Sequence, residues 1–331
     1  MKKVNLFLLG LVFVLAFTVA CEKEEEAKIN EAEVLVKYLE SADSPLGKDF
    51  VNSDMPTIIA ADEVKTLNET GQVYIIDIRS AADFATGHIA NAVNVAVADL
   101  LTHIKGVDLT KYTKVAIACY TGQTAGYSAS LLRLMGYSKV YSLKWGMCSW
   151  HTDFAGKWKT TIAGGNARAT QFETTNNDKA VKGELPVLST GKSTGKDILE
   201  ARVTALLTEG FTPASVTNAA IFDNLTANYI INYWPAAQYT DPGHIPGAVQ
   251  YTPKETIKFD VDLLTLPTDK PIAIYCYTGQ TSAYLAAYLR LLGYDAKSIL
   301  YGANGMIYDK MVAKQMTVFN DAQIKGYDYV K

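Results

Sequence analysis

Cys119-Tyr-Thr-Gly-Gln-Thr124 recurs farther along the chain as Cys276-Tyr-Thr-Gly-Gln-Thr281. Over residues 119–137 and 276–294, 13 of 19 aligned residues are identical, at an offset of 157. Each copy follows a short apolar run and precedes a helix-like segment, which places the cysteine at a strand-to-helix turn. A repeat on this scale indicates two copies of one domain.

The first copy alternates strand-like and helix-like segments. Residues 73–78 and 115–118 are continuous β-rich runs, typical of strands that are buried on both faces. Residues 125–134 form a helix pattern that Gly136 ends, and residues 140–143 are a further strand. Strands that alternate with helices favour a parallel sheet covered on both faces.

Several short motifs accompany these elements in a fixed order. They are Asp77-Ile-Arg79, Asp83-Phe84, Gly87-His-Ile89, the Cys119 turn and Trp145-Gly146. Together they resemble the rhodanese family, and the pattern recurs downstream. The resemblance implies an α/β fold of two rhodanese-like domains, each a mainly parallel five-stranded sheet flanked by helices. It also implies a sulfur-transfer site on the cysteine loop.

The residues themselves support a reactive cysteine. Because the turn after Cys119 opens a helix, backbone N–H groups and the helix dipole should favour an anion at the sulfur. Gly122 allows the loop to take a positive φ. We expect a thiolate with a pKa below the free value, able to hold sulfur as a persulfide, with the Thr124 hydroxyl as an additional donor. The alternative is a buried structural cysteine.

The candidate site extends beyond the two sulfur atoms. The predicted catalytic residues are Cys119 and Cys276, and the predicted loop residues are Tyr120, Thr121, Gly122, Gln123, Thr124, Tyr277, Thr278, Gly279, Gln280 and Thr281. The resemblance implies that Arg79 pairs with Asp77 and Asp83 and braces the site, rather than binding substrate. Cys148 is either a packed free cysteine or a resolving thiol for Cys119.

The second copy departs from the first beside its loop. Asn232-Tyr-Trp234 stands where the first copy has Asp77-Ile-Arg79, and Gln238 replaces Asp83. Removing both partners of a pair costs far less than stranding one charge. We therefore expect a folded second domain with a differently shaped site, in which Cys276 is either catalytic or restricted to binding.

Three functions follow from these features. The first is a sulfurtransferase that takes sulfane sulfur from thiosulfate or a persulfide donor and passes it to a thiol or to cyanide. Tyr120 and Tyr277 stand where many thiosulfate-using relatives carry a basic residue, so activity on thiosulfate is expected to be weak. The second is a phosphatase of the same fold. It would need an arginine to bind phosphate where Ala125 and Ser282 stand, so the sequence argues against it. The third function is a non-catalytic envelope module that carries persulfide or binds a partner.

Composition excludes other classes. A net charge of −3 over 331 residues gives no reason to expect nucleic acid as a partner. The four histidines are scattered and Cys-x-x-Cys is absent, so we expect no metal and no organic cofactor.

The N-terminus predicts export. Lys2 and Lys3 precede an apolar run over residues 4–20, as in a secretory signal. Ala20-Cys21 resembles a bacterial lipoprotein signal, which implies that Cys21 is lipidated and that the protein is anchored in the cell envelope, at the outer membrane. The acidic run 22–26 is either a surface-export signal or a solvated linker.

These observations divide the chain into five parts. The predicted divisions are residues 1–20, a lipoprotein signal peptide; 21–56, an acidic tether and a helix expected to pack on the first domain; 57–160, the first rhodanese-like domain; 161–195, a linker; and 196–331, the second rhodanese-like domain.

Overall fold

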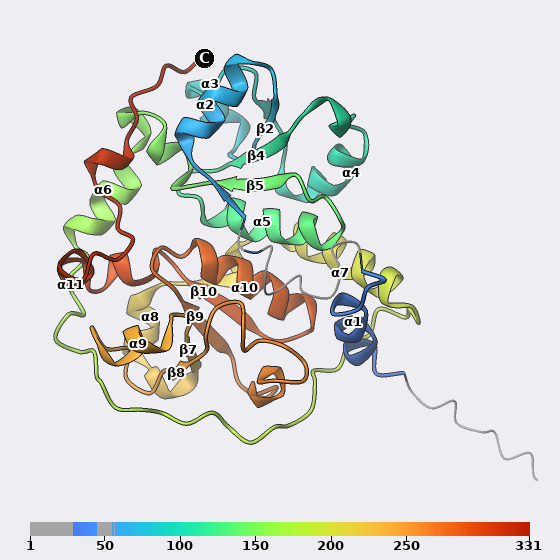
Figure 1. Cartoon of the computed structure of the whole chain (residues 1–331), viewed down its shortest axis with the longest axis vertical. Coiled ribbons are helices and arrows are strands. Elements are labelled where there is room, and N and C mark those ends of the chain that lie inside the picture. Colours follow the sequence, from blue (N-terminus) through green and yellow to red (C-terminus); the bar gives the residue numbers. More distant parts are fainter. Residues whose placement is uncertain (1–28, 45–54, 56) are drawn as a thin grey trace, which may run out of the picture.

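The computed structural model describes residues 29–44, 55 and 57–331. Within these ranges the chain builds the same α/β unit twice, one unit above the other in Figure 1. The predicted signal peptide, Cys21 and the acidic run lie outside the described residues, as does most of the segment before the first repeat.

Each repeat is organised around a five-stranded sheet. The strand orders are β1-β5-β4-β2-β3 and β6-β10-β9-β7-β8, and all neighbouring strands are parallel. The strands are β1 (Ile58–Ile59), β2 (Val73–Asp77), β3 (Val93–Asn94), β4 (Lys114–Ala118), β5 (Val140–Leu143), β6 (Ser215–Val216), β7 (Tyr229–Asn232), β8 (Val249–Gln250), β9 (Ile272–Tyr275) and β10 (Ala296–Ile299). The predicted fold class is confirmed.

The helices cover both faces of these sheets. They are α1 (Glu31–Leu39), α2 (Ala61–Glu69), α3 (Ala81–Thr86), α4 (Leu100–Lys105), α5 (Gln123–Leu134), α6 (Gly156–Ala163), α7 (Gly195–Glu209), α8 (Asn218–Asp223), α9 (Ala236–Thr240), α10 (Gln280–Leu291) and α11 (Tyr308–Ala313). The buried strands β4 and β9 each deliver the chain into a cysteine loop, and α5 and α10 begin within those loops.

The two repeats share one hydrophobic core. Helices α5 and α10 lie against each other between the two sheets (Figure 1), and a continuous cluster of buried side chains runs from Ile76 in the first repeat to Tyr288 in the second. Gly126 permits this approach, since a Cβ at that position would lie 3.0 Å from the carbonyl oxygen of Gln280. The interface between the repeats is therefore part of the protein interior.

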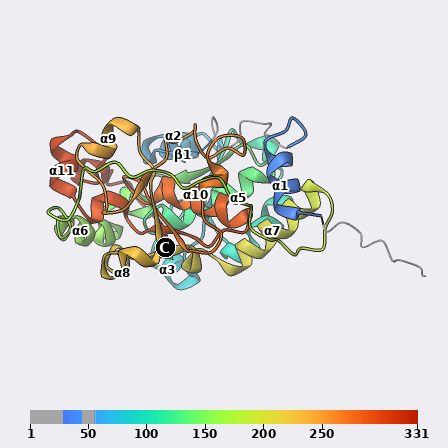
Figure 2. The same cartoon turned by 90° about the horizontal axis from the view of Figure 1, so that it is seen from below.

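Helix α1 packs against α7, at the beginning of the second repeat, and Figure 2 shows the two helices together at one end of the molecule. The Glu31 carboxylate accepts hydrogen bonds from the backbone N–H groups of Thr190 (2.7 Å) and Gly191 (2.9 Å). The sequence favoured packing on the first repeat. That expectation is wrong for the main contact, because the apolar face of α1 is complementary to α7.

Each repeat is covered by a segment of chain that lies outside its own sheet and helices. The C-terminal segment, residues 317–330, follows the second repeat but lies along the first, as the red trace in Figure 1 shows. Its Val330 forms an antiparallel bridge with His88. The linker wraps around the second repeat, where Glu173 forms the corresponding bridge with His244. The covering segments thus contact the equivalent Gly-His turn of each repeat.

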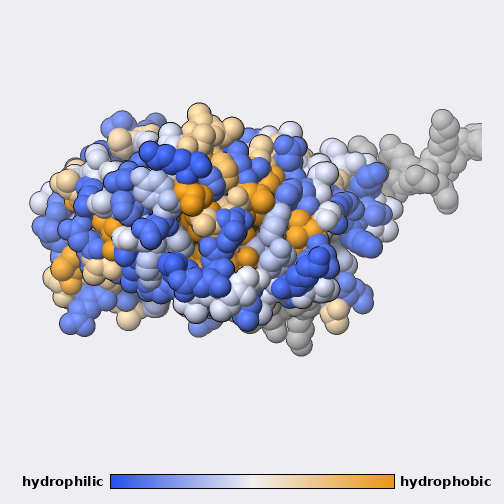
Figure 3. All heavy atoms as spheres, turned by 90° about the horizontal axis from the view of Figure 1, so that it is seen from above, coloured by the Kyte–Doolittle hydropathy of each residue, from blue (hydrophilic) through white to orange (hydrophobic). Residues whose placement is uncertain are grey.

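The surface of the molecule is predominantly hydrophilic on the face seen in Figure 3, where apolar side chains form separate groups among polar ones. In the ranges that the structure describes, no helix combines the length and the apolar character needed to cross a bilayer.

Candidate functional site

The first cysteine loop holds its sulfur with backbone donors. The Sγ atom of Cys119 accepts hydrogen bonds from the N–H groups of Gly122 (3.2 Å) and Ala125 (3.4 Å). Gly122 has φ 88° and precedes α5, so the loop closes around the sulfur as predicted from the glycine. Among the described residues the donors to this sulfur are backbone groups, and the predicted donation from the Thr124 hydroxyl is not observed.

The segment that begins with Trp145-Gly146 contacts the backbone of the cysteine loop. The Met147 N–H donates to the Cys119 carbonyl at 2.8 Å. A Cβ on Gly146 would lie only 2.4 Å from that same carbonyl oxygen, and the residue has φ 61°. Only glycine fits this position without displacing the cysteine loop. The motif therefore helps to fix the conformation of the cysteine loop, although it follows β5 and the loop follows β4.

The Cys119 side chain is closed off from solvent, with 3% of its surface exposed. Burial raises the pKa of its thiol above the usual range, while the backbone N–H groups of Ala125, Thr121 and Gly122 act in the opposite direction. The expected low pKa is therefore wrong for the closed site, because loss of hydration outweighs the hydrogen bonds. The backbone donors offset part of the effect of burial and favour the anionic form of the sulfur.

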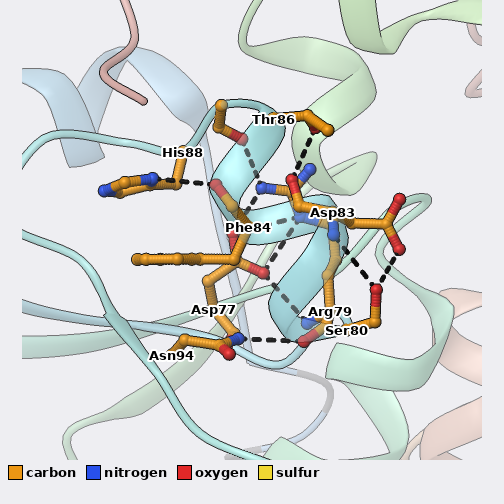
Figure 4. Close-up of polar contacts among 9 residues, drawn as sticks. Asp77, Arg79, Ser80, Asp83, Phe84, Thr86, His88 and Asn94 are labelled. Carbon is orange, nitrogen blue, oxygen red and sulfur yellow. Dashed lines mark hydrogen bonds and ion pairs between the residues drawn. The ribbon is translucent and has the colours of Figure 1, made fainter.

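Asp77 and Arg79 form the buried brace that the resemblance implied. The guanidinium donates to both carboxylate oxygens, with Nε–Oδ1 at 3.0 Å and Nη2–Oδ2 at 2.6 Å, and also to the Gly87 carbonyl at 2.7 Å (Figure 4). Both side chains are 1% exposed. Asn94 donates to the carbonyl oxygens of Asp77 and Arg79, each at 2.9 Å.

Asp83 does not join this pair. Its carboxylate accepts a hydrogen bond from the hydroxyl of Ser80, which caps α3 (Figure 4), and its side chain is partly exposed. The resemblance implied that Asp83 pairs with Arg79 as Asp77 does, and that expectation is wrong. The structure assigns it to the first turn of α3, where a carboxylate favours the helix N-terminus.

The second loop repeats the backbone geometry with one additional hydroxyl. Cys276 Sγ accepts from the N–H groups of Gly279 (3.2 Å) and Ser282 (3.3 Å), and the Ser282 hydroxyl lies 3.5 Å from the sulfur. Ser282 in turn contacts the hydroxyl of Ser298 at 2.8 Å. The first repeat has Ala125 at the position of Ser282, so this chain of hydroxyls belongs to the second site.

The surroundings of the second loop are neutral. Asn232 donates to the Tyr275 hydroxyl at 2.7 Å, and the Trp234 ring lies 5.6 Å from that of Tyr277. The Tyr277 hydroxyl donates to Gln238. In place of a charged brace, the three substituted side chains thus contact two tyrosines at the loop, Tyr275 and Tyr277.

Each cysteine loop also contacts the other repeat through its glutamine. The Gln280 side-chain oxygen accepts from the Trp145 N–H at 3.0 Å, and that of Gln123 accepts from the Tyr301 N–H at 2.7 Å. Both glutamines are at most 2% exposed. The sequence identified them as loop residues but gave no sign of this exchange, which depends on how the repeats pack.

Residues distant in the sequence also reach the first loop. The Trp158 indole donates to the Thr121 carbonyl at 3.1 Å, and the Lys157 ammonium lies 3.9 Å from the centre of the Tyr120 ring. Both belong to α6, which follows the last strand of the first sheet. The sequence contained no signal for either contact, because α6 lies outside every motif of the resemblance.

Cys148 is a packed thiol. Its Sγ atom donates to the Phe154 carbonyl at 3.0 Å, and burial raises its pKa to about 12. It is a free cysteine, as are Cys119 and Cys276. Over the described residues, no group of three or more His, Cys, Asp or Glu side chains is arranged to hold a metal ion.

Comparisons with known proteins place these features in a family. The model of the rhodanese-like domain matches residues 60–153 and 218–306. Thiosulfate sulfurtransferase GlpE of Pseudomonas fluorescens is 33% identical over 110 residues, which cover 33% of this chain and 94% of that protein. The enzyme of the same name from Shewanella oneidensis is 30% identical over 93 residues, 28% of this chain and 90% of that protein.

A further match is to a solved structure. It is SseA of Escherichia coli, described as a 3-mercaptopyruvate sulfotransferase with the rhodanese fold. The match is 17% identical, spans 76% of this chain and 99% of that one, and has a TM-score of 0.27.

Proposed function

This chain belongs to the rhodanese-like domain family, with two copies in tandem, and from that premise we propose that it is a sulfurtransferase. In this proposal a cysteine thiolate accepts one sulfane sulfur and carries it as a persulfide to a second substrate. The relatives named thiosulfate sulfurtransferase support a small sulfur-containing donor and a thiophilic acceptor as the two substrates.

The observation that carries the proposal is the pair of backbone N–H groups directed at Cys119 Sγ. Donors fixed at a helix N-terminus favour an anion, and both the thiolate and the persulfide are anions. With thiosulfate as donor, the thiolate attacks the outer sulfur, the S–S bond of thiosulfate breaks, and sulfite leaves with the bonding electron pair. A thiol or cyanide then removes the outer sulfur and regenerates the thiolate.

The proposal assigns the leading role to Cys119. The buried Asp77–Arg79 pair fixes the end of β2 beside the first loop, whereas Asn232 and Trp234 replace it beside the second. A second candidate role follows from this difference: the second repeat carries persulfide, or binds a partner, without turning over. The same hydrogen-bonded cradle at Cys276 is compatible with either role.

Mass spectrometry of the intact protein after exposure to thiosulfate or to inorganic polysulfide tests the proposal. We expect a gain of one sulfur that is lost in Cys119→Ser and released by added thiol or cyanide. A persulfide that forms on Cys276 but is not released would assign the carrier role to the second repeat. Sulfane transfer that survives the Cys119→Ser/Cys276→Ser double variant would refute the proposed function.

We also propose that the protein is exported and anchored by lipid at Cys21, in the bacterial outer membrane. The support is the sequence of residues 1–26 alone. A single acyl chain binds a membrane only marginally, so stable anchoring requires several chains on the mature N-terminus. Metabolic labelling with a fatty-acid analogue should mark the protein, and Cys21→Ser should abolish both the label and the membrane association.

A further inference from the structure

Two cations flank the tyrosine that follows the first cysteine. The Lys157 ammonium lies 3.9 Å from the centre of the Tyr120 ring, and the Arg79 guanidinium carbon lies 5.7 Å from it. The six loop residues themselves carry no basic side chain. The tertiary structure therefore brings positive charge to a loop that is neutral in sequence.

The two cations differ in what already holds them. Arg79 is buried and engaged by Asp77 and by the Gly87 carbonyl. Lys157 is exposed, and within the described residues it forms no ion pair. Its neighbour Lys159, on the same helix, lies 3.4 Å from the Asp321 carboxylate. Lys157 is thus the cation beside the first loop whose charge is not already neutralised by the protein.

The contact with Tyr120 leaves Lys157 available to a ligand. A cation over an aromatic ring at an exposed site contributes about 0.5–1 kcal/mol. A doubly charged oxyanion attracts an ammonium group more strongly than an aromatic ring does. Lysine suits such a ligand because its ammonium acts as a compact point charge. Tyr120 therefore holds the ammonium next to the residue that follows Cys119, and the weak contact leaves the charge available to an anion.

The tyrosine of the second loop has different neighbours. The Tyr277 ring packs on Trp234, and its hydroxyl donates to Gln238. Over the described part of the chain, no lysine or arginine lies over the Tyr277 ring. The two loops thus have the same sequence, but the tyrosine of the first has cations beside it and the tyrosine of the second has neutral side chains.

We propose that Lys157 binds the anionic end of the sulfur donor at the first site and makes that site selective for charged donors. This proposal rests on the proposed function and adds the substrate class. With thiosulfate, the ammonium faces the sulfonate oxygens while Cys119 attacks the outer sulfur. It then stabilises the departing sulfite, which leaves as a dianion. The second site, with its neutral surroundings, favours an uncharged sulfane donor.

The test uses the full chain in a Cys276→Ser background, so that only the first site reacts. Lys157→Ala and the matched control Lys159→Ala are compared with two donors, thiosulfate and an uncharged dialkyl polysulfane. We expect Lys157→Ala to raise KM for thiosulfate about tenfold and to flatten the salt dependence of kcat/KM. The uncharged donor should be used at an unchanged rate, and Lys157→Arg should restore most of the thiosulfate activity.

Three outcomes would overturn the proposal. These are an unchanged KM for thiosulfate in Lys157→Ala, an equal loss with both donors, and an equal effect of Lys159→Ala. A binding measurement keeps the test independent of catalysis: calorimetry with thiosulfate on the Cys119→Ser/Cys276→Ser protein should give a dissociation constant about tenfold higher when Lys157 is also replaced. If no donor transfers sulfur yet this difference is found, the proposed function fails while the anion site stands.

Discussion

Replacing Arg79 with methionine should strongly destabilise the first repeat. The substitution removes the guanidinium that binds both oxygens of the Asp77 carboxylate and leaves that carboxylate at 1% exposure. A buried charge that loses its partner costs about 3–5 kcal/mol. The Gly87 carbonyl loses a donor in the same step. Since small proteins are stable by about 5–15 kcal/mol, the loss is a large fraction of the total.

The second repeat supplies the comparison for this experiment. It carries Asn232 and Trp234 where the first has Asp77 and Arg79. The double variant Asp77→Asn/Arg79→Trp reproduces that pair and leaves no unpaired charge, so we expect it to lose about 1–3 kcal/mol, chiefly from imperfect packing and the free Gly87 carbonyl. The double variant should thus be more stable than Arg79→Met, although it carries one more substitution.

Urea unfolding followed by tryptophan fluorescence measures both quantities, and the shared core favours one transition for the two repeats. Lys105→Met is the control. It removes an ion pair of similar length, 2.7 Å to Glu200, but both side chains are about half exposed, so the loss of stability should be small. A loss below 1 kcal/mol in Arg79→Met would refute the reasoning. A double variant that is less stable than Arg79→Met would refute it as well.

Three further predictions concern stability. Gln280→Ala leaves the buried Trp145 N–H without its acceptor and should cost about 1–3 kcal/mol, measured as a lower urea midpoint; an unchanged midpoint would contradict the interlocked loops. Phe319→Ala removes a fully buried ring of the C-terminal segment and should cost about 3–5 kcal/mol, whereas a neutral effect would show that this segment does not stabilise the first repeat. Because burial raises the pKa of Cys148 from 9.0 to about 12, the folded state keeps a proton that the unfolded chain releases. Its contribution to stability is complete below about pH 9 and declines as the pH rises toward 12; Cys148→Ala should flatten that decline, and an equally steep profile would contradict the assignment.

The sequence alone was sufficient for the fold and for the position of the two cysteine loops at its strand-to-helix turns. The repeated Cys119 and Cys276 loops, each between an apolar strand and a helix, predicted two parallel α/β units, and the described residues confirm them. Such inferences succeed because hydrophobic periodicity, a turn glycine and a helix start are local properties, which a short stretch of chain determines. The pairing of Asp77 with Arg79 was implied by the resemblance, and the structure shows that pair buried.

Other properties of the site depend on contacts between distant segments, and only the tertiary structure determined them. The sequence predicted a low pKa for Cys119, yet burial reverses the direction, because hydration is set by everything that packs over the sulfur. The exchange of Gln123 and Gln280 between repeats and the position of Lys157 over Tyr120 arise in the same way. Local sequence fixes where the cysteine loop forms, whereas its exposure and its surrounding charge depend on which distant residues the packed chain places beside it.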